Sequence, residues 1–260
     1  MVQFCDTMIQ YIRKEEIIEY LKEKKVCSIE ELQEKYTVSI STIHRDLNLL
    51  EREGRIHKYY GKVAIKTEQN FYKSRINVNV ELKRGIAQKA LSFIESGDCI
   101  FLDNSTTVYY LAEALCRSSL KNIIVVSNSA FISDLFFNTT DIDFIALGGK
   151  LHKDLNCFIG ADAERVIKKF NGNKYFFSTS SISIAGGISD IYVPDENIIK
   201  VIMNKYSKVS YLLVDSTKFG KESTIKWFEI SDVDHVITDS NLAKDQLRQF
   251  QTRGVEIITT

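Results

Sequence analysis

Three stretches near the start of the chain carry apolar residues at intervals of three or four positions. This interval predicts amphipathic helices, because 3.6 residues complete one turn and the apolar side chains then share a face. The first stretch covers about residues 13–25, with Ile17 and Leu21 on its apolar face. The second begins at Ser28, which has Glu31 three positions later and so predicts a capping box.

The third stretch, Val38–Gly54, reads "VSISTIHRDLNLLEREG" and has two contrasting faces. The apolar positions predicted to pack inward are Ile40, Ile43, Leu47 and Leu50. The opposite face carries hydroxyls, an imidazole, a guanidinium and an amide, on Ser41, Thr42, His44, Arg45 and Asn48. Such groups form hydrogen bonds with the phosphates and base edges of DNA, although a merely solvated face is the alternative. Ser39 and Gly54 are the expected N-cap and C′ residues.

The order helix, helix, tight turn, helix predicts a helix-turn-helix, whose last helix enters the major groove of DNA. The next segment, "RIHKYYGKVAIK", predicts a short hairpin, or wing, that turns at Gly61. Between Arg52 and Lys66 five basic residues stand against one acidic residue, Glu53. Such a patch binds phosphates through counterion release, or is simply solvated. Beside the recognition face, the predicted DNA contacts are Ser28, Ser39, Arg55, Lys58 and Lys62.

From about residue 81 to the end, short β-branched runs alternate with segments of helical spacing. The runs are "CIFLD", "IIVVSN", "DFIALGG", "YFFSTS", "SYLLVD", "HVITD" and "VEIIT". This alternation predicts parallel strands joined by crossover helices, which is an α/β fold with a mostly parallel sheet. The predicted organisation is a winged helix-turn-helix at 1–65, a linker at 66–80 and an α/β domain at 81–260. Pro194 is expected to precede a helix capped by Asp195.

Ligands of open α/β sheets bind outside the carboxyl ends of the strands. The first strand is followed by "NSTT" at the expected start of a helix, where free N–H groups favour an anion; an ordinary N-cap is the alternative. Glu196 and Lys200 share a helix face at i and i+4, either as a surface ion pair or as a charged wall of a polyol site. The candidate ligand contacts at strand ends are Asp103, Asn104, Ser105, Thr106, Thr107, Ser127, Asn128, Gly148, Gly149, Ser180, Asp215 and Lys218.

The 34 basic and 34 acidic residues give a formal net charge of zero, so any attraction to nucleic acid has to be local. The chain starts without a basic segment followed by an apolar core, and no apolar run approaches ~18 residues, which predicts a cytoplasmic protein without a membrane segment. Scattered cysteines and histidines predict neither a disulfide framework nor a metal site. Dinucleotide-binding, P-loop and nucleophile-elbow motifs are absent, so no cofactor is expected.

The chain resembles the DeoR-type repressors of bacterial sugar metabolism over nearly its full length. The resemblance is carried by "SIEELQEKYTVSISTIHRDLNLLEREG" and then, in family order, by "FLDNSTTVYYLAEAL", "VVSNS", "LGGKL", "PDENIIK", "LLVDSTKFG" and "VITD". It implies a regulator that binds a double-stranded DNA operator. Its sensor domain would look like the sugar-phosphate isomerase and CoA-transferase fold and bind a phosphorylated sugar. A homodimer or homotetramer is expected, because one small module buries little DNA surface.

By position, the resemblance assigns a phosphate loop and the rest of an effector site. The loop residues would be Asp103, Ser105, Thr106 and Thr107, and the remainder Glu196, Lys200, Asp215 and Lys218. Three positions depart from the family pattern: His44 stands where an Arg is usual, and Asn104 and Ser105 replace the second and third residues of D-S-G-T-T. A Ser in place of Gly adds a Cβ where backbone should approach phosphate, so either the effector differs or phosphate affinity is reduced.

The function predicted from the sequence is transcriptional regulation, in the simplest case repression, and not enzymatic catalysis. Two alternatives stay open. One is a sugar-phosphate isomerase with a DNA-binding appendage, for which Glu196 or Asp103 could serve as general base. The other is a regulator whose sensor site is vestigial, which the altered loop at Asn104 and Ser105 would favour.

Overall fold

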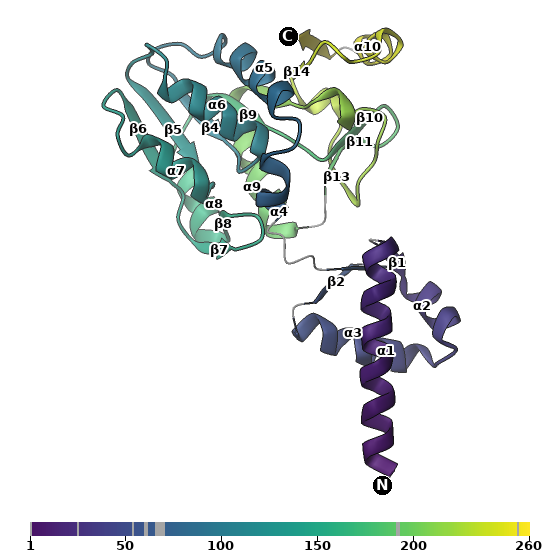
Figure 1. Cartoon of the computed structure of the whole chain (residues 1–260). Helices are drawn as coiled ribbons and strands as arrows, with labels where there is room; N and C mark the ends of the chain where they lie inside the picture. The colour runs from purple at the N-terminus through teal and green to yellow at the C-terminus, as the bar shows by residue number, and fades with distance from the viewer. Residues whose placement is uncertain are drawn as a thin grey trace. The chain divides into compact units, whose positions relative to one another are not determined.

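The computed structural model describes residues 2–24, 26–53, 55–59, 62–65, 71–190, 193–253 and 255–260. The chain divides into two compact units, Met1–Asn70 and Phe71–Thr260 (Figure 1). The predictions that concern Gly54, Gly61 and Lys66 lie outside the described residues. Within the described ranges, no helix has the length and apolar character needed to cross a membrane.

The first unit has the predicted helix-turn-helix and wing. Its elements are α1 (Val2–Lys24), β1 (Val26–Ser28), α2 (Ile29–Tyr36), α3 (Ile40–Arg52), β2 (Ile56–Tyr59) and β3 (Lys62–Ile65). β2 and β3 form the predicted antiparallel hairpin, and β1 pairs with the other edge of β3. The sequence pattern misses β1, because three residues give no usable period, and it places the start of α1 near residue 13 instead of at Val2.

One apolar cluster holds this unit together. The fully buried side chains at its centre are Ile17, Leu21, Leu32, Ile43, Leu47 and Leu50. Ser28 and Ser39 cap α2 and α3, since their hydroxyl oxygens accept the N–H groups of Glu31 and Thr42. Between the two helices Thr37 adopts a φ of 52°, and this left-handed residue makes the tight turn.

The second unit is built on a seven-stranded parallel sheet in the order β15-β14-β12-β9-β4-β5-β6. Its strands are β4 (Cys99–Leu102), β5 (Ile123–Ser127), β6 (Ile142–Ala146), β9 (Gly172–Phe177), β12 (Ser207–Leu213), β14 (His235–Thr238) and β15 (Glu256–Thr259). Each of the apolar runs in the sequence corresponds to one of these strands, and the predicted fold class is confirmed.

Helices cover both faces of the sheet and give three layers (Figure 1). One face is covered by α5 (Val80–Leu91), α6 (Thr106–Cys116) and α7 (Ala130–Phe136), and the other by α8 (Ala161–Ile167), α9 (Pro194–Lys205) and α10 (Lys244–Gln251). An apolar cluster fills each of the two interfaces. Because both faces of these strands are buried, their sequences are nearly continuous runs of apolar residues.

Two small sheets lie outside this frame and have no clear signal in the sequence. They pair β7 (Lys150–His152) with β8 (Cys157–Ile159), and β10 (Ser181–Ser183) with β11 (Gly187–Asp190) and β13 (Ile225–Phe228). The helix near Pro194 also differs from the prediction. It begins at Pro194 itself, with Val193 as N-cap, and Asp195 lies inside it. Proline fits the first helical position because its missing N–H would have no partner there.

A short helix, α4 (Phe71–Ile76), begins the second unit, precedes α5 and packs against the rest of this unit. The Tyr72 ring stacks on that of Phe131, with centroids 4.5 Å apart. The hydroxyl of Tyr110 donates a hydrogen bond to the carbonyl oxygen of Ile76 at 3.0 Å. Part of the stretch predicted as a linker, 66–80, is therefore built into the second unit.

The strand order reverses beside β4. β5 and β6 continue on one side of it, whereas β9, β12, β14 and β15 continue on the other. In open α/β sheets, the crevice outside the carboxyl ends of the strands at such a reversal is the usual place for a ligand. A ligand site is therefore expected at the loops that follow β4, β9 and β12.

Candidate ligand pocket and recognition helix

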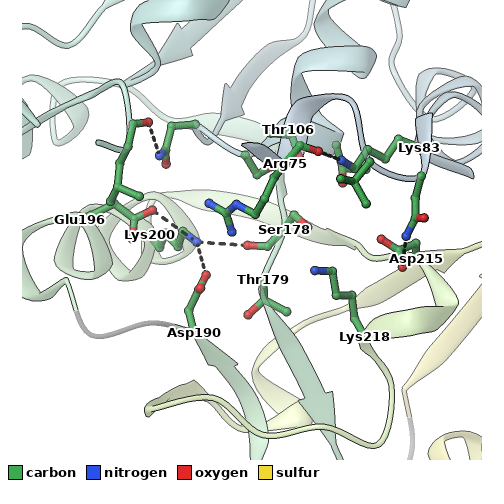
Figure 2. A pocket seen from close by; sticks show the side chains of 16 residues that line it. Arg75, Lys83, Thr106, Ser178, Thr179, Asp190, Glu196, Lys200, Asp215 and Lys218 are labelled. Atoms are coloured by element: carbon green, nitrogen blue, oxygen red, sulfur yellow. Dashed lines mark hydrogen bonds and ion pairs between the residues drawn. The ribbon is translucent and has the colours of Figure 1, made fainter. Parts of the chain in front are cut away.

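A pocket of about 100 Å³ lies at this reversal point (Figure 2). Loops after neighbouring strands supply part of its lining: Asn104, Ser105, Thr106 and Thr107 after β4, Ser178 and Thr179 after β9, and Asp215 and Lys218 after β12. The other lining residues are Arg75, Val78, Asn79, Lys83, Leu155, Asp190, Glu196 and Lys200. Segments far apart in the sequence therefore meet at the carboxyl ends of three adjacent strands.

One end of the pocket is basic. It is lined by Arg75 of α4, Lys83 of α5 and Lys218 of the short helix η1 (Ser216–Lys218) (Figure 2). The Lys83 ammonium donates a hydrogen bond to the carbonyl oxygen of Arg75 at 2.5 Å. Burial lowers the pKa of Lys83 to about 8 and also lowers the pKa of Lys218, because a desolvated ammonium is costly. Asp215, which accepts a hydrogen bond from Asn79 at 3.4 Å, is the carboxylate at this end.

The start of α6 borders the pocket beside these cations (Figure 2). Ser105 caps the helix by accepting the N–H of Val108 at 3.3 Å, and Tyr109 donates to the Ser105 carbonyl. The N–H groups of Thr106 and Thr107 lie in the first turn, where the helix dipole favours an anion. Ser105 has a φ of −74°, so the position that is glycine in the family pattern needs no left-handed conformation here.

The other end of the pocket is acidic and centres on Lys200. Its ammonium lies 3.1 Å from Asp190, 3.3 Å from Glu196 and 3.8 Å from Asp103, and all four side chains are buried. It also donates a hydrogen bond to the Ser178 carbonyl at 3.1 Å. Glu196 and Lys200 are therefore not a surface ion pair.

Burial governs the protonation of these groups. It raises the pKa of Glu196 to about 7, an effect that Lys200 opposes and that Asp190 and Asp103 reinforce. Burial raises the pKa of Asp103 as well. Burial also disfavours the ammonium of Lys200, but the surrounding carboxylates raise its pKa above the usual value. One ammonium thus serves three carboxyl groups.

Of the predicted ligand contacts, Asn104, Ser105, Thr106, Thr107, Glu196, Lys200, Asp215 and Lys218 line the pocket. Asp103 does not; its carboxylate accepts the backbone N–H groups of Ser105 at 2.9 Å and Ser178 at 3.1 Å. Ser180 also lies outside the lining and donates a hydrogen bond to Asp190. Both residues hold lining residues in place.

The other predicted contacts outside the lining are Ser127, Asn128, Gly148 and Gly149. The Ser127 hydroxyl oxygen accepts the N–H of Ser129 at 3.0 Å, and the Asn128 carbonyl accepts that of Phe158 at 2.7 Å. Gly149 has a φ of 104°, and a Cβ there would come within 2.7 Å of the Ile159 carbonyl oxygen. Ser127, Asn128 and Gly149 therefore have roles in local packing, which a sequence alone does not separate from ligand binding.

Six polar lining residues are not among the contacts predicted from the sequence: Arg75, Asn79, Lys83, Ser178, Thr179 and Asp190. Lys83 does have a signal, since it shares the buried face of α5 with Ile86 and Ala90. A lysine within an apolar stripe is out of place and marks a candidate. Ser178 and Thr179 directly follow β9, where the prediction takes only Ser180.

The outer face of α3 carries the residues predicted to contact DNA. Ser41, His44, Arg45 and Asn48 are exposed on it and surround a shallow hollow with Ile40, Leu49 and Arg52. Ile40, predicted to be in the core, is 45% exposed. It begins α3, and because side chains lean toward a helix N-terminus it projects past the core. The Ser39 hydroxyl lies 2.8 Å from that of Thr42.

Several basic side chains near this face have acidic partners. Arg55 forms a bidentate ion pair with the carboxylate of Glu15 in α1. Lys58 lies 3.3 Å from the carboxylate of Glu51 and donates a hydrogen bond to Asn48. The local excess of positive charge is therefore smaller in the folded protein than the sequence count indicates.

Solved structures with a related fold are distant. Ribose 5 phosphate isomerase A from Neisseria gonorrhoeae is 20% identical, with a TM-score of 0.40, and the match covers 54% of this chain and 53% of that chain. For eIF2B beta from Chaetomium thermophilum the identity is 15%, the TM-score 0.43, and the coverage 75% of this chain and 52% of that one. The chain thus spans about half the length of these structures.

Curated relatives match over nearly the whole chain. The HTH-type transcriptional regulator IolR of Bacillus subtilis is 31% identical, over 93% of this chain and 96% of its own length. The L-fucose operon activator of Haemophilus influenzae is also 31% identical, over 92% of this chain and 95% of its own length. The HTH-type transcriptional regulator GlpR of Haloferax volcanii is 26% identical, over 96% and 98%.

Two family models match successive parts of the chain. A DeoR-like helix-turn-helix domain matches residues 13–69, and a DeoR C terminal sensor domain matches residues 78–240. The second match alone covers more than half of the chain, and the resemblance inferred from the sequence is confirmed. The chain belongs to the DeoR family of helix-turn-helix transcriptional regulators.

Proposed function

We propose that this chain is a transcriptional repressor of a sugar operon, and that a phosphorylated sugar bound in the pocket controls its affinity for DNA. Its relatives include the L-fucose operon activator of Haemophilus influenzae and a putative aga operon transcriptional repressor of Escherichia coli. Control of this kind requires that the sugar bind the DNA-competent and DNA-incompetent states with different affinity.

The division of the pocket into a basic and an acidic end carries this proposal. A phosphate at the basic end would lie beside the first turn of α6 and meet Arg75, Lys83 and Lys218. Burial lowers the pKa of both lysines, because a desolvated ammonium without a nearby negative charge is unfavourable. A bound phosphate dianion would supply that negative charge. This arrangement suits a phosphate monoester better than a neutral ligand.

Sugar hydroxyls would occupy the other end. The Asp190 carboxylate and the carboxyl oxygens of Glu196 can accept hydrogen bonds from hydroxyl groups, and the Thr179 side chain adds a further polar group. Asp215, held by Asn79, would meet the part of the ligand nearest the phosphate. A ligand with an anion at one end and several hydroxyls at the other matches both ends.

On the DNA side, α3 would enter the major groove with His44 and Arg45 at base edges. The residues proposed for phosphate contacts are Ser28, Ser39, Ser41, Thr42, Asn48, Arg55, Lys58 and Lys62. Two copies of α3 in a homodimer, or more in a homotetramer, would bind successive half-sites of an operator. The proposed place of action is the cytoplasm.

The proposed function is tested by fluorescence anisotropy of the full chain on its own upstream DNA, at fixed salt, titrated with a panel of sugar phosphates. We expect one compound to release the DNA, and the parent sugar without phosphate to be at least about tenfold less effective. Lys218→Gln should abolish the response and leave DNA affinity unchanged. Lys221→Gln, an exposed neighbour outside the pocket, is the matched control.

Two results would contradict this proposal in different ways. DNA binding without release by any phosphorylated sugar would favour a vestigial sensor site. Conversion of an aldose phosphate to its ketose during the titration would favour an isomerase-like enzyme.

The recognition role of α3 gives a separate prediction. Arg45→Ala should weaken operator binding by about 1–3 kcal/mol and relax the preference at one base pair, if the guanidinium contacts a base edge. Competition against operators changed at single positions measures both effects. Lys22→Ala, on the exposed face of α1, is the control. Unchanged affinity and preference would remove Arg45 from the proposed contacts.

A further inference from the structure

Counted as formal charges, with every carboxyl group ionised, the charged groups at the pocket balance before any ligand enters. The cations are Arg75, Lys83, Lys200 and Lys218, and the carboxyl groups are Asp103, Asp190, Glu196 and Asp215. A sugar phosphate adds a charge of roughly −1.5 to −2 near neutral pH. In a buried site such an excess is expensive, and the usual response is a change of protonation instead of an unpaired charge.

We propose that the pocket takes up a proton together with its anionic ligand, and that Glu196 binds this proton. The proposal rests on the function proposed above and adds a property of the same site. In its neutral form the Glu196 carboxyl group would also donate a hydrogen bond, so that the ligand would meet a donor and not a second negative charge.

Glu196 has the weakest support among the four carboxyl groups. Asp103 accepts two backbone N–H groups, Asp190 accepts a serine hydroxyl, and Asp215 accepts an amide N–H. For Glu196, the partner found among the described residues is Lys200 at 3.3 Å. That ammonium is nearer to Asp190 and is shared with Asp103 as well. Protonation of Glu196 therefore sacrifices fewer hydrogen bonds and ion pairs than protonation of any of the other three carboxylates.

Five titratable groups of the described residues face Glu196. They are Lys200 on the same helix, Asp190 on β11, Asp103 after β4, Cys157 on β8 and Tyr175 on β9. Burial raises the pKa of the Cys157 thiol and of the Tyr175 phenol, so both stay neutral. Burial raises the pKa of Glu196 to about 7, so that near neutral pH the empty pocket holds this group partly protonated. A nearby anion raises this pKa further, and uptake follows.

Isothermal titration calorimetry on the full chain tests the proposal. The two ligands used are inorganic sulfate and the sugar phosphate that releases DNA most effectively in the anisotropy titration. Between pH 6.0 and 7.5, affinity should fall up to about fourfold more for the wild-type protein than for Glu196→Gln. The ligand's own titration affects both proteins equally and so cancels in the comparison. Lys83, whose pKa burial lowers to about 8, stays mostly protonated over this pH range in both proteins. In buffers of different ionisation enthalpy, the wild-type protein should take up about half a proton at pH 7 from Glu196, and Glu196→Gln should lack this contribution.

A second variant keeps the test decisive if Glu196→Gln does not fold. Asp190→Asn removes a negative charge that raises the pKa of Glu196, so the pH dependence should move to lower pH. Equal pH dependence in the wild-type and Glu196→Gln proteins would overturn the proposal, as would an unshifted profile in Asp190→Asn. If neither sulfate nor any sugar phosphate binds, the proposed function itself fails.

Discussion

Replacing Lys200 by methionine should lower the free energy of unfolding of the second unit by about 3–5 kcal/mol at pH 8. The substitution leaves the carboxyl groups of Asp103, Asp190 and Glu196 buried without their shared cation. Breaking a buried ion pair from one side is costly, because the remaining charges keep their desolvation penalty and lose the attraction. Urea unfolding followed by the fluorescence of Trp227, the single tryptophan, reports on this unit.

The loss in Lys200→Met should shrink as the pH falls toward 5. Without the ammonium, the pKa values of Asp103 and Glu196, which burial already raises, rise further in the folded state, so the folded protein binds more protons than the unfolded chain. Stability then increases as pH decreases, relative to the wild-type protein. Lys205→Met, exposed on the same helix, should change stability by less than about 0.5 kcal/mol. A loss independent of pH would show that packing, and not charge, is responsible.

Arg13→Met should destabilise the first unit by roughly 3 kcal/mol. The Arg13 guanidinium lies 2.6 Å from the carboxylate of Asp46, a fully buried residue of α3, and joins α1 to the recognition helix. Gln10 also donates to Asp46, at 2.7 Å, which places the expected loss at the lower end of the range for a broken buried pair. DNA affinity should fall as well, because α3 loses part of its attachment.

Hydrogen exchange measured by mass spectrometry locates this effect. In Arg13→Met, amides of α1 and α3 should exchange faster, whereas those of β4 and β9 in the second unit should not change. Lys22→Met, whose exposed partner on the same helix is Glu19, should leave exchange as it is. Wild-type protection in Arg13→Met would mean that the pair with Asp46 contributes little.

The strands of the main sheet could be predicted because both of their faces are buried. The run that contains Phe101 and Leu102 is apolar throughout, and such runs are visible without any structure. The serine-rich strand Ser181–Ser183 carries no such pattern, since its hydroxyls pair with polar groups such as Ser223 and Glu222. These side-chain hydrogen bonds join residues about 40 positions apart in the sequence, which no local period records.

Apart from Glu196 and Lys200 on α9, the predicted lining residues are those that a strand end introduces. Thr106, Thr107 and Asp215 follow apolar runs, so the position of the loop indicated them. Arg75 comes from a helix that precedes the sheet, and Asp190 from a short strand, so only the folded chain brings them to the same site. Gly149 also follows a strand, and the close approach of the Ile159 carbonyl oxygen already accounts for a glycine at that place.

The central position of β4 has a consequence for how the protein is made. β4 leaves the ribosome first among the strands of its sheet, and its partner β5 follows soon after. Its other partner, β9, begins at Gly172, about 70 residues after β4 ends. At synthesis rates of roughly 5–20 residues per second, the nascent half-sheet keeps one edge of β4 open for about 4–14 s. During this interval the growing chain exposes an apolar strand edge to other chains, so recovery of native protein should depend on the rate of translation and on chaperones.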